Sequence, residues 1–97
     1  MPLIEAKAAG NARAAAAAEL VASGRKQLAL YDVEGYQEAT PLFREAIEAA
    51  PGFAPAYVGL AETYSYWGFR REIVGGECQS LYDMALECAG AALGLDA

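Results

Sequence analysis

The chain has 97 residues, so it forms at most one domain, and a domain of this size buries only about 65% of its unfolded surface. Just over half of the residues are hydrophobic, but much of that share is alanine, which favours helix and adds little buried area. A net charge of −6 without any histidine argues against a nucleic-acid surface, which would need clustered lysine and arginine side chains.

The first predicted helix covers about residues 12–31, with Asn11 as its N-cap. Alanine and leucine recur through this stretch at helical spacing. Residues 1–11 form an N-terminal extension that either continues the helix or makes a separate turn, with Gly10 as the weak point.

The second predicted helix is amphipathic and ends at about residue 50, before Pro51. It starts near residue 36 with a slight kink at Pro41, or at residue 41 with Thr40 as its N-cap. On its solvent side, Arg44 and Glu48 are spaced to form an ion pair one turn apart.

The third predicted helix covers about residues 54–67, with Pro55 in its first turn, and ends before Gly68. Residues 68–77 are predicted to form an irregular connection, followed by a last helix over about 78–95 that stops near Gly94. The apolar stripes of helices two to four are Ala39, Leu42, Phe43, Ala46, Ile47 and Ala50; Tyr57, Leu60, Ala61 and Tyr64; and Leu81, Met84, Ala85, Cys88, Ala89 and Ala92.

The order of small and large residues in these stripes resembles the tetratricopeptide repeat (TPR). The second helix of such a repeat is matched by Ala39, Phe43, Ala46 and Pro51, and the first helix of the next repeat by Tyr57, Leu60, Ala61 and Tyr64. Small residues allow close helix contact, and the large aromatics fill the wider gaps. The second-helix pattern recurs at Ala85, Ala89 and Ala92, with Ala89 in place of a large aromatic, and Leu20 and Gly24 match an eroded first helix.

The resemblance implies an all-α fold in which antiparallel helical hairpins stack as a short α-α superhelix of about four helices. One domain would span residues 1–97, with repeat 1 at about 12–51 and repeat 2 at about 54–97, the latter carrying the inserted loop 68–77. A helical bundle without repeats is the alternative.

The resemblance also implies a protein-binding concave surface, lined by the first helix of each repeat. The matching positions are Val58, Glu62, Ser65 and Tyr66 in the second repeat, and Val21, Arg25 and Leu28 in the first. Chaperone-binding members of the family carry a clamp of Lys, Asn and Arg here, whereas this chain has Val21, Val58 and Gly59, so chaperone C-terminal peptides are not expected partners.

Four aromatic residues gather near the end of the third predicted helix. Tyr64 and Trp67 are expected in the core, whereas Tyr66 and Phe69 flank the helix end and are candidates for partner contact, because tyrosine and other aromatics often dominate interface energies.

No catalytic or metal chemistry is suggested by the sequence. There is no histidine, and no nucleophile–base pair or phosphate-binding loop can be assembled, so we expect no enzyme and no cofactor. Cys78 and Cys88 would lie roughly 15 Å apart on one helix, too far for a disulfide, and are expected to be reduced thiols.

No apolar run reaches the roughly 20 residues that span a bilayer, and Glu5, Lys7 and Arg13 interrupt the N-terminal stretch, unlike a signal peptide. We therefore expect a soluble, cytoplasmic protein; Glu5 and Glu19 count against an organelle transit peptide.

Two functions remain open at this point. The first is an adaptor that binds a partner peptide or helix in the concave groove. The second is a structural subunit or a self-associating unit such as a homo-oligomer, because a two-repeat array should leave the apolar face of its last, C-terminal hairpin uncovered.

Overall fold

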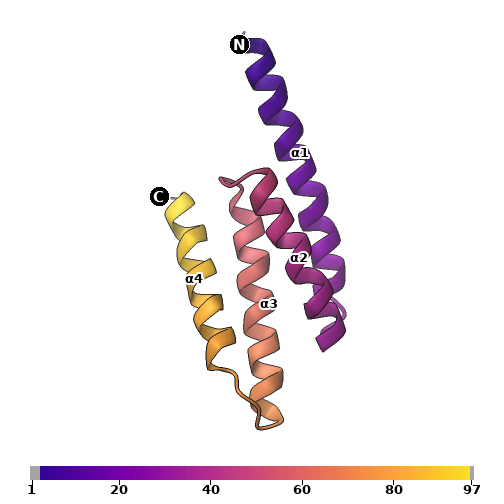
Figure 1. The fold of residues 1–97 in the computed structure, drawn as a ribbon, viewed down its shortest axis with the longest axis vertical. Coiled ribbons are helices and arrows are strands. Elements are labelled where there is room, and N and C mark those ends of the chain that lie inside the picture. Colours follow the sequence, from indigo (N-terminus) through magenta and orange to yellow (C-terminus); the bar gives the residue numbers. More distant parts are fainter. Residues whose placement is uncertain (1–2, 97) are drawn as a thin grey trace.

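Four α-helices make up the protein: α1 (Leu3–Leu28), α2 (Val33–Ala49), α3 (Ala54–Ile73) and α4 (Gln79–Asp96). The computed structural model describes the backbone of residues 3–96 and the side-chain surroundings of residues 10–95. Successive helices run antiparallel, so that α1 with α2 and α3 with α4 form two hairpins side by side (Figure 1). The predicted all-α hairpin architecture is confirmed.

Helix α1 is longer at its start and shorter at its end than predicted. It continues unbroken through Gly10 to Leu3, so the predicted continuation of the helix is confirmed and the predicted N-cap at Asn11 is wrong. Its N-terminal part extends beyond the bundle (Figure 1). It stops at Leu28 because Tyr31 adopts a left-handed conformation with φ 51°, which turns the chain back toward α2.

Helix α2 begins at Val33, before both of its predicted starts. The carboxylate of Asp32 accepts a hydrogen bond from the Gly35 N–H at 2.6 Å and caps the helix. Thr40 is therefore an interior residue, whose hydroxyl donates to the Tyr36 carbonyl at 2.8 Å, and Pro41 lies within the helix.

Helix α3 runs to Ile73, so the predicted end before Gly68 is wrong, and residues 68–73 of the expected loop are helical. Gly68 serves close contact between helices: a Cβ there would lie 2.8 Å from the Tyr82 ring of α4. The chain turns instead at Gly75, with φ 76°. Helix α4 ends at Asp96, close to its predicted end near Gly94.

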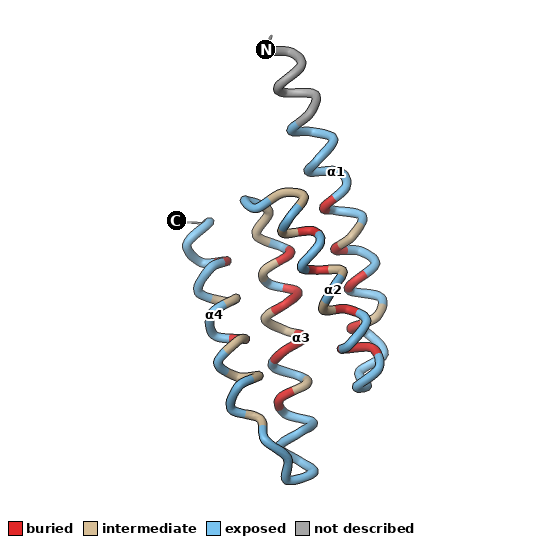
Figure 2. Tube along the Cα trace, viewed as in Figure 1, coloured by how far each residue is buried: buried red, intermediate tan, exposed pale blue. Residues whose placement is uncertain are grey.

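The core is centred on Phe43 of α2, which is completely buried and packs against both α1 and α3. A Cβ on Gly24 of α1 would lie 2.8 Å from the Phe43 ring, and one on Gly59 of α3 would lie closer still. The ring therefore occupies the space that side chains at these two glycines would need. Figure 2 shows that buried residues concentrate where α1, α2 and α3 face one another and are sparse on α4.

Replacing Phe43 with alanine is expected to lower the free energy of unfolding by about 3–5 kcal/mol, because it leaves a cavity between three helices. Denaturant unfolding followed by circular dichroism measures the change. Phe69→Ala is the matched control: this phenylalanine is exposed, and its loss should cost about 0.5 kcal/mol or less. Equal costs for the two variants would contradict the central position of Phe43.

Two helical glycines should respond in opposite directions to alanine. Gly59→Ala is expected to destabilise the fold by about 1–3 kcal/mol, because the new methyl group overlaps the buried Phe43 ring. Gly90→Ala on α4 meets nothing within 4 Å and should stabilise it by up to about 1 kcal/mol through helix propensity. Thermal unfolding of the two variants gives the comparison, and a stabilising Gly59→Ala would refute the close contact.

Candidate functional site

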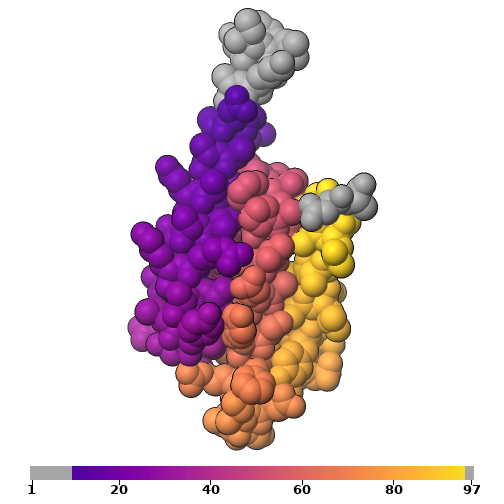
Figure 3. All heavy atoms as spheres, turned by 180° about the vertical axis from the view of Figure 1, so that it is seen from behind, coloured from indigo at the N-terminus to yellow at the C-terminus, as the bar shows by residue number. Residues whose placement is uncertain are grey.

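An open groove of about 720 Å³ lies between α3 and α4, and we call it the α3/α4 groove. Figure 3 views the face of the molecule across which α1, α3 and α4 lie in that order. The walls of the groove are largely apolar. They are formed by Val58, Ala61, Glu62, Ser65 and Tyr66 of α3, and by Tyr82, Ala85, Leu86, Ala89, Ala92 and Leu93 of α4.

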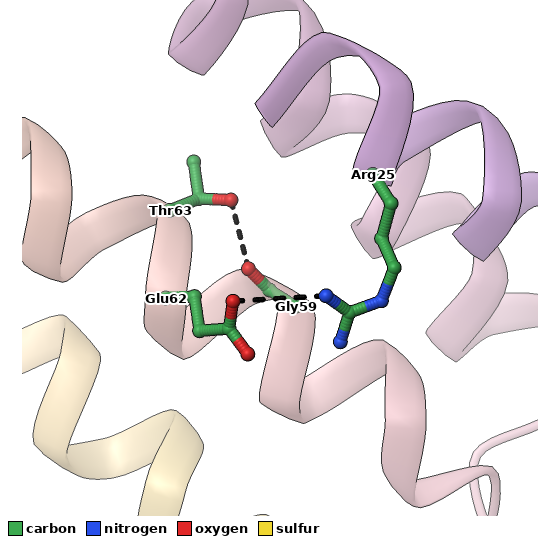
Figure 4. Close-up of polar contacts among 4 residues, drawn as sticks. All are labelled: Arg25, Gly59, Glu62 and Thr63. Atoms are coloured by element: carbon green, nitrogen blue, oxygen red, sulfur yellow. Dashed lines mark hydrogen bonds and ion pairs between the residues drawn. The ribbon is translucent and has the colours of Figure 1, made fainter. Parts of the chain in front are cut away.

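Four of the eight predicted binding residues line this groove together: Val58, Glu62, Ser65 and Tyr66. They share one face of α3 because they recur at helical spacing. A fifth, Arg25 of α1, reaches the same region by an ion pair with Glu62, in which the nitrogen and oxygen are 3.6 Å apart (Figure 4). Both side chains are substantially exposed, so the pair adds little stability.

The other three predicted residues lie elsewhere. Val21 and Leu28 are only 7% and 4% exposed, because they share the inward face of α1 with Ala17, and in this structure neither side chain is accessible to a partner. Phe69 is exposed but lies outside the groove, in a smaller hollow beside Tyr31.

The aromatic residues of α3 divide as the sequence predicts. Tyr64 is buried in the core, and Trp67 is partly buried and packs against the core. Tyr66 is exposed, and its ring meets that of Tyr31 edge-on with the centroids 5.4 Å apart. Tyr66 lines both the groove and the hollow that contains Phe69, so it connects these two surfaces.

The α4 wall of the groove was predicted only in part: Ala85, Ala89 and Ala92 belong to the predicted apolar stripe, whereas Tyr82, Leu86 and Leu93 do not. Leu86 and Leu93 are 71% and 72% exposed, and with Tyr82 and Ala89 they form an apolar stripe beside the buried stripe of α4. The signal was present, because these four residues follow the spacing of a helix face. One apolar stripe was predicted for this helix, the one that contains Met84 and Ala85, and a second stripe beside it was not considered.

The walls of the groove carry one charged group, an acidic one, which is paired with Arg25 of α1. Glu62 is the charged residue among the residues that form its walls. The sequence of α4 contains Asp83, Glu87 and Asp96 but neither lysine nor arginine. Arg70 of α3 lies outside the groove walls and donates a hydrogen bond to the Tyr31 carbonyl at 2.8 Å.

Thr63 of α3 is a buried polar residue next to Glu62, and its hydroxyl forms a hydrogen bond within its own helix. It donates to the Gly59 carbonyl at 2.8 Å, one turn earlier in α3 (Figure 4). Thr63 therefore offers no free polar group to a ligand, and the polar chemistry on this side of α3 comes from Glu62 and Ser65.

A second hollow, of about 500 Å³, lies among α2, α3 and α4 on another side of the molecule. Arg44, which lines it, donates to the Tyr64 hydroxyl, and its predicted ion pair with Glu48 is not found among the described residues. Cys88 lies in this hollow as a free thiol, and burial raises its pKa, which makes it less reactive. Cys78 is also free.

Within the part of the chain that the structure describes, no group of three or more histidine, cysteine or acidic residues is placed to hold a metal ion. None of the described helices combines the length and the apolar character that crossing a membrane requires.

Comparisons of the chain with protein-family models, with curated protein sequences and with solved structures find no significant match.

The pKa of Tyr82, in the groove wall, should be measurably perturbed. Its hydroxyl donates to Glu72 Oε2 at 2.6 Å, and this hydrogen bond to a carboxylate raises the pKa to about 12. Because the folded-state pKa is raised, the stabilising contribution of the contact is complete below the ordinary value of 10 and is lost as the pH rises toward 12.

A titration of the Tyr82 ring carbon by ¹³C NMR measures this pKa. Glu72→Gln should move it back toward 10, whereas Glu45→Gln on α2, which carries no such contact, should leave it unchanged. An unperturbed Tyr82 in the unsubstituted chain would show that the contact does not form in solution.

Proposed function

We propose that this protein is a non-catalytic protein-interaction module that binds a helix or peptide of a protein partner in the α3/α4 groove. The observation that carries the proposal is the exposure of Leu86 and Leu93 opposite Val58, Glu62, Ser65 and Tyr66. A contiguous apolar surface rimmed by polar groups is typical of an interaction site. Tyr66 at its edge is of the residue type that often dominates interface energies.

We further propose that the module is of the tetratricopeptide type. Support comes from the eight residues between 39 and 64 that match the repeat and from the order of two antiparallel hairpins. In such an array each hairpin covers the preceding one. Here α3 covers the first hairpin, and the groove lies on the equivalent face of the second.

The proposal includes neither an active site nor a cofactor, nor binding to nucleic acid or direct insertion into a membrane. An apolar groove suits a protein partner, and its walls offer no lysine or arginine to a phosphate. We place the protein in the cytoplasm, and the free thiols of Cys78 and Cys88 support a reducing compartment.

Self-association or assembly into a larger complex is the second candidate function. It is favoured by the same two exposed leucines of α4, which a second copy or a larger subunit could cover. Because Leu93 lines the same groove as Glu62 and Tyr66, substitutions at these residues affect both functions. The oligomeric state of the chain separates them.

Partners captured from an extract of the source cell by the immobilised chain, and read by mass spectrometry, test the module. A stoichiometric partner should be retained by the unsubstituted chain and reduced at least tenfold by Tyr66→Ala, Glu62→Arg or Leu93→Asp, with helicity unchanged. Leu30→Asp is the matched control, because Leu30 is an exposed leucine outside the groove.

Sedimentation of the purified chain completes the test. A monomer that retains a groove-dependent partner supports the adaptor. A dimer that Leu93→Asp dissociates would replace the adaptor with the self-associating unit, and a partner indifferent to all three groove substitutions would refute binding in the groove.

A further inference from the structure

We propose that the occupant of the α3/α4 groove is an amphipathic α-helix that inserts one large apolar side chain beside Ala89 and places a basic residue three positions later beside Glu62. This inference rests on the proposed function and specifies the chemistry of the partner. It follows from a comparison of the two hairpins, one of which is already covered by a helix of the same chain.

The covered face of the first hairpin shows how such a surface is filled. Phe43 of α2 projects into the interface, and its ring lies against Gly24 of α1 and Gly59 of α3. The first hairpin thus supplies the large side chain, Phe43, and the covering helix α3 supplies the glycine that makes room for it. Three residues after Gly59, Glu62 pairs with Arg25 of the hairpin, so the covering helix also supplies the negative charge (Figure 4).

The second hairpin carries the opposite residues at the corresponding positions. The repeat of small residues places Ala89 where the first hairpin has Phe43, and Ala61 where it has Gly24. Both alanines line the groove, and no side chain of the described residues fills the space between them as the Phe43 ring does. A helix that covers the second hairpin must therefore carry the large apolar side chain that Phe43 provides in the first hairpin.

The charge is reversed in the same way. Glu62 stands where the first hairpin has Arg25, and the sequence of α4 contains no basic residue. We expect the partner helix to lie on the second hairpin as α3 lies on the first. Its large side chain then takes the place of Gly59, and the residue three positions later lies beside Glu62. A lysine or arginine there can share the Glu62 carboxylate with Arg25, because the Arg25–Glu62 pair is exposed and open to a second cation. A second copy of α3 does not fit, because it offers Gly59 and Glu62 at these two positions.

Two synthetic peptides test this complementarity. Both have the sequence of residues 54–73 with Glu62→Arg, and one of them also carries Gly59→Phe. Fluorescence anisotropy measures their binding to the full chain and to its Ala89→Phe variant. The unsubstituted chain is expected to bind the phenylalanine peptide at least tenfold more tightly than the glycine peptide.

The Ala89→Phe chain is expected to reverse this preference, because it recreates the pairing of Phe43 with Gly59. Ala89→Leu serves the same purpose if the larger substitution unfolds the chain, as judged by circular dichroism. Leu86→Asp, at an exposed residue of the groove, should weaken the binding of both peptides, which would show that they bind in the groove.

Equal affinity of the two peptides, weakened by Leu86→Asp, would overturn the requirement for a large side chain and leave binding in the groove standing. Failure of both peptides to bind would overturn the inference, while capture of a groove-dependent natural partner would still support the proposed function. A chain that sediments as a dimer, and as a monomer with Ala89→Phe, would identify a second copy as the occupant and overturn the partner helix.

Discussion

The contact of the Phe43 ring with Gly24 and Gly59 sets the arrangement of the first three helices. A fully buried phenylalanine contributes more apolar burial than any alanine of the chain, and it can do so only because both facing residues lack a Cβ. The glycines lower the helix propensity of α1 and α3, and the buried ring offsets that cost. The placement of α3, and through it of the second hairpin, depends on this contact.

The second hairpin is held together by smaller contacts. Gly68 admits the Tyr82 ring against α3, and Ala85 and Ala92 are buried between the helices. At the position that corresponds to Phe43, α4 has the small residue Ala89. The same absence of bulk that thins the core leaves an apolar groove on the surface. The proposed function is therefore a consequence of how this small domain distributes its few large side chains.

Much of the fold was predictable because helix faces are encoded by local spacing. The stripes containing Ala39 and Phe43, Leu60 and Tyr64, and Ala85 and Ala92 are buried as the sequence indicates. Four predicted binding residues also meet in one groove, since they share a face of α3. The boundaries were less predictable: Gly68 looks like a stop signal in the sequence, but its contact with Tyr82 makes it part of a longer helix.

By itself, then, the sequence determined that the chain forms antiparallel helices with small and large residues alternating on their inner faces, because a 3.6-residue period is a local property. Only the tertiary structure decided which residues form the uncovered surface. Val21 and Leu28 match a binding face in the sequence but are buried in the core, whereas Leu86 and Leu93, which lie outside the predicted apolar stripe of α4, are exposed and line the groove. Burial depends on which neighbour a helix face meets, and that neighbour is distant in the sequence.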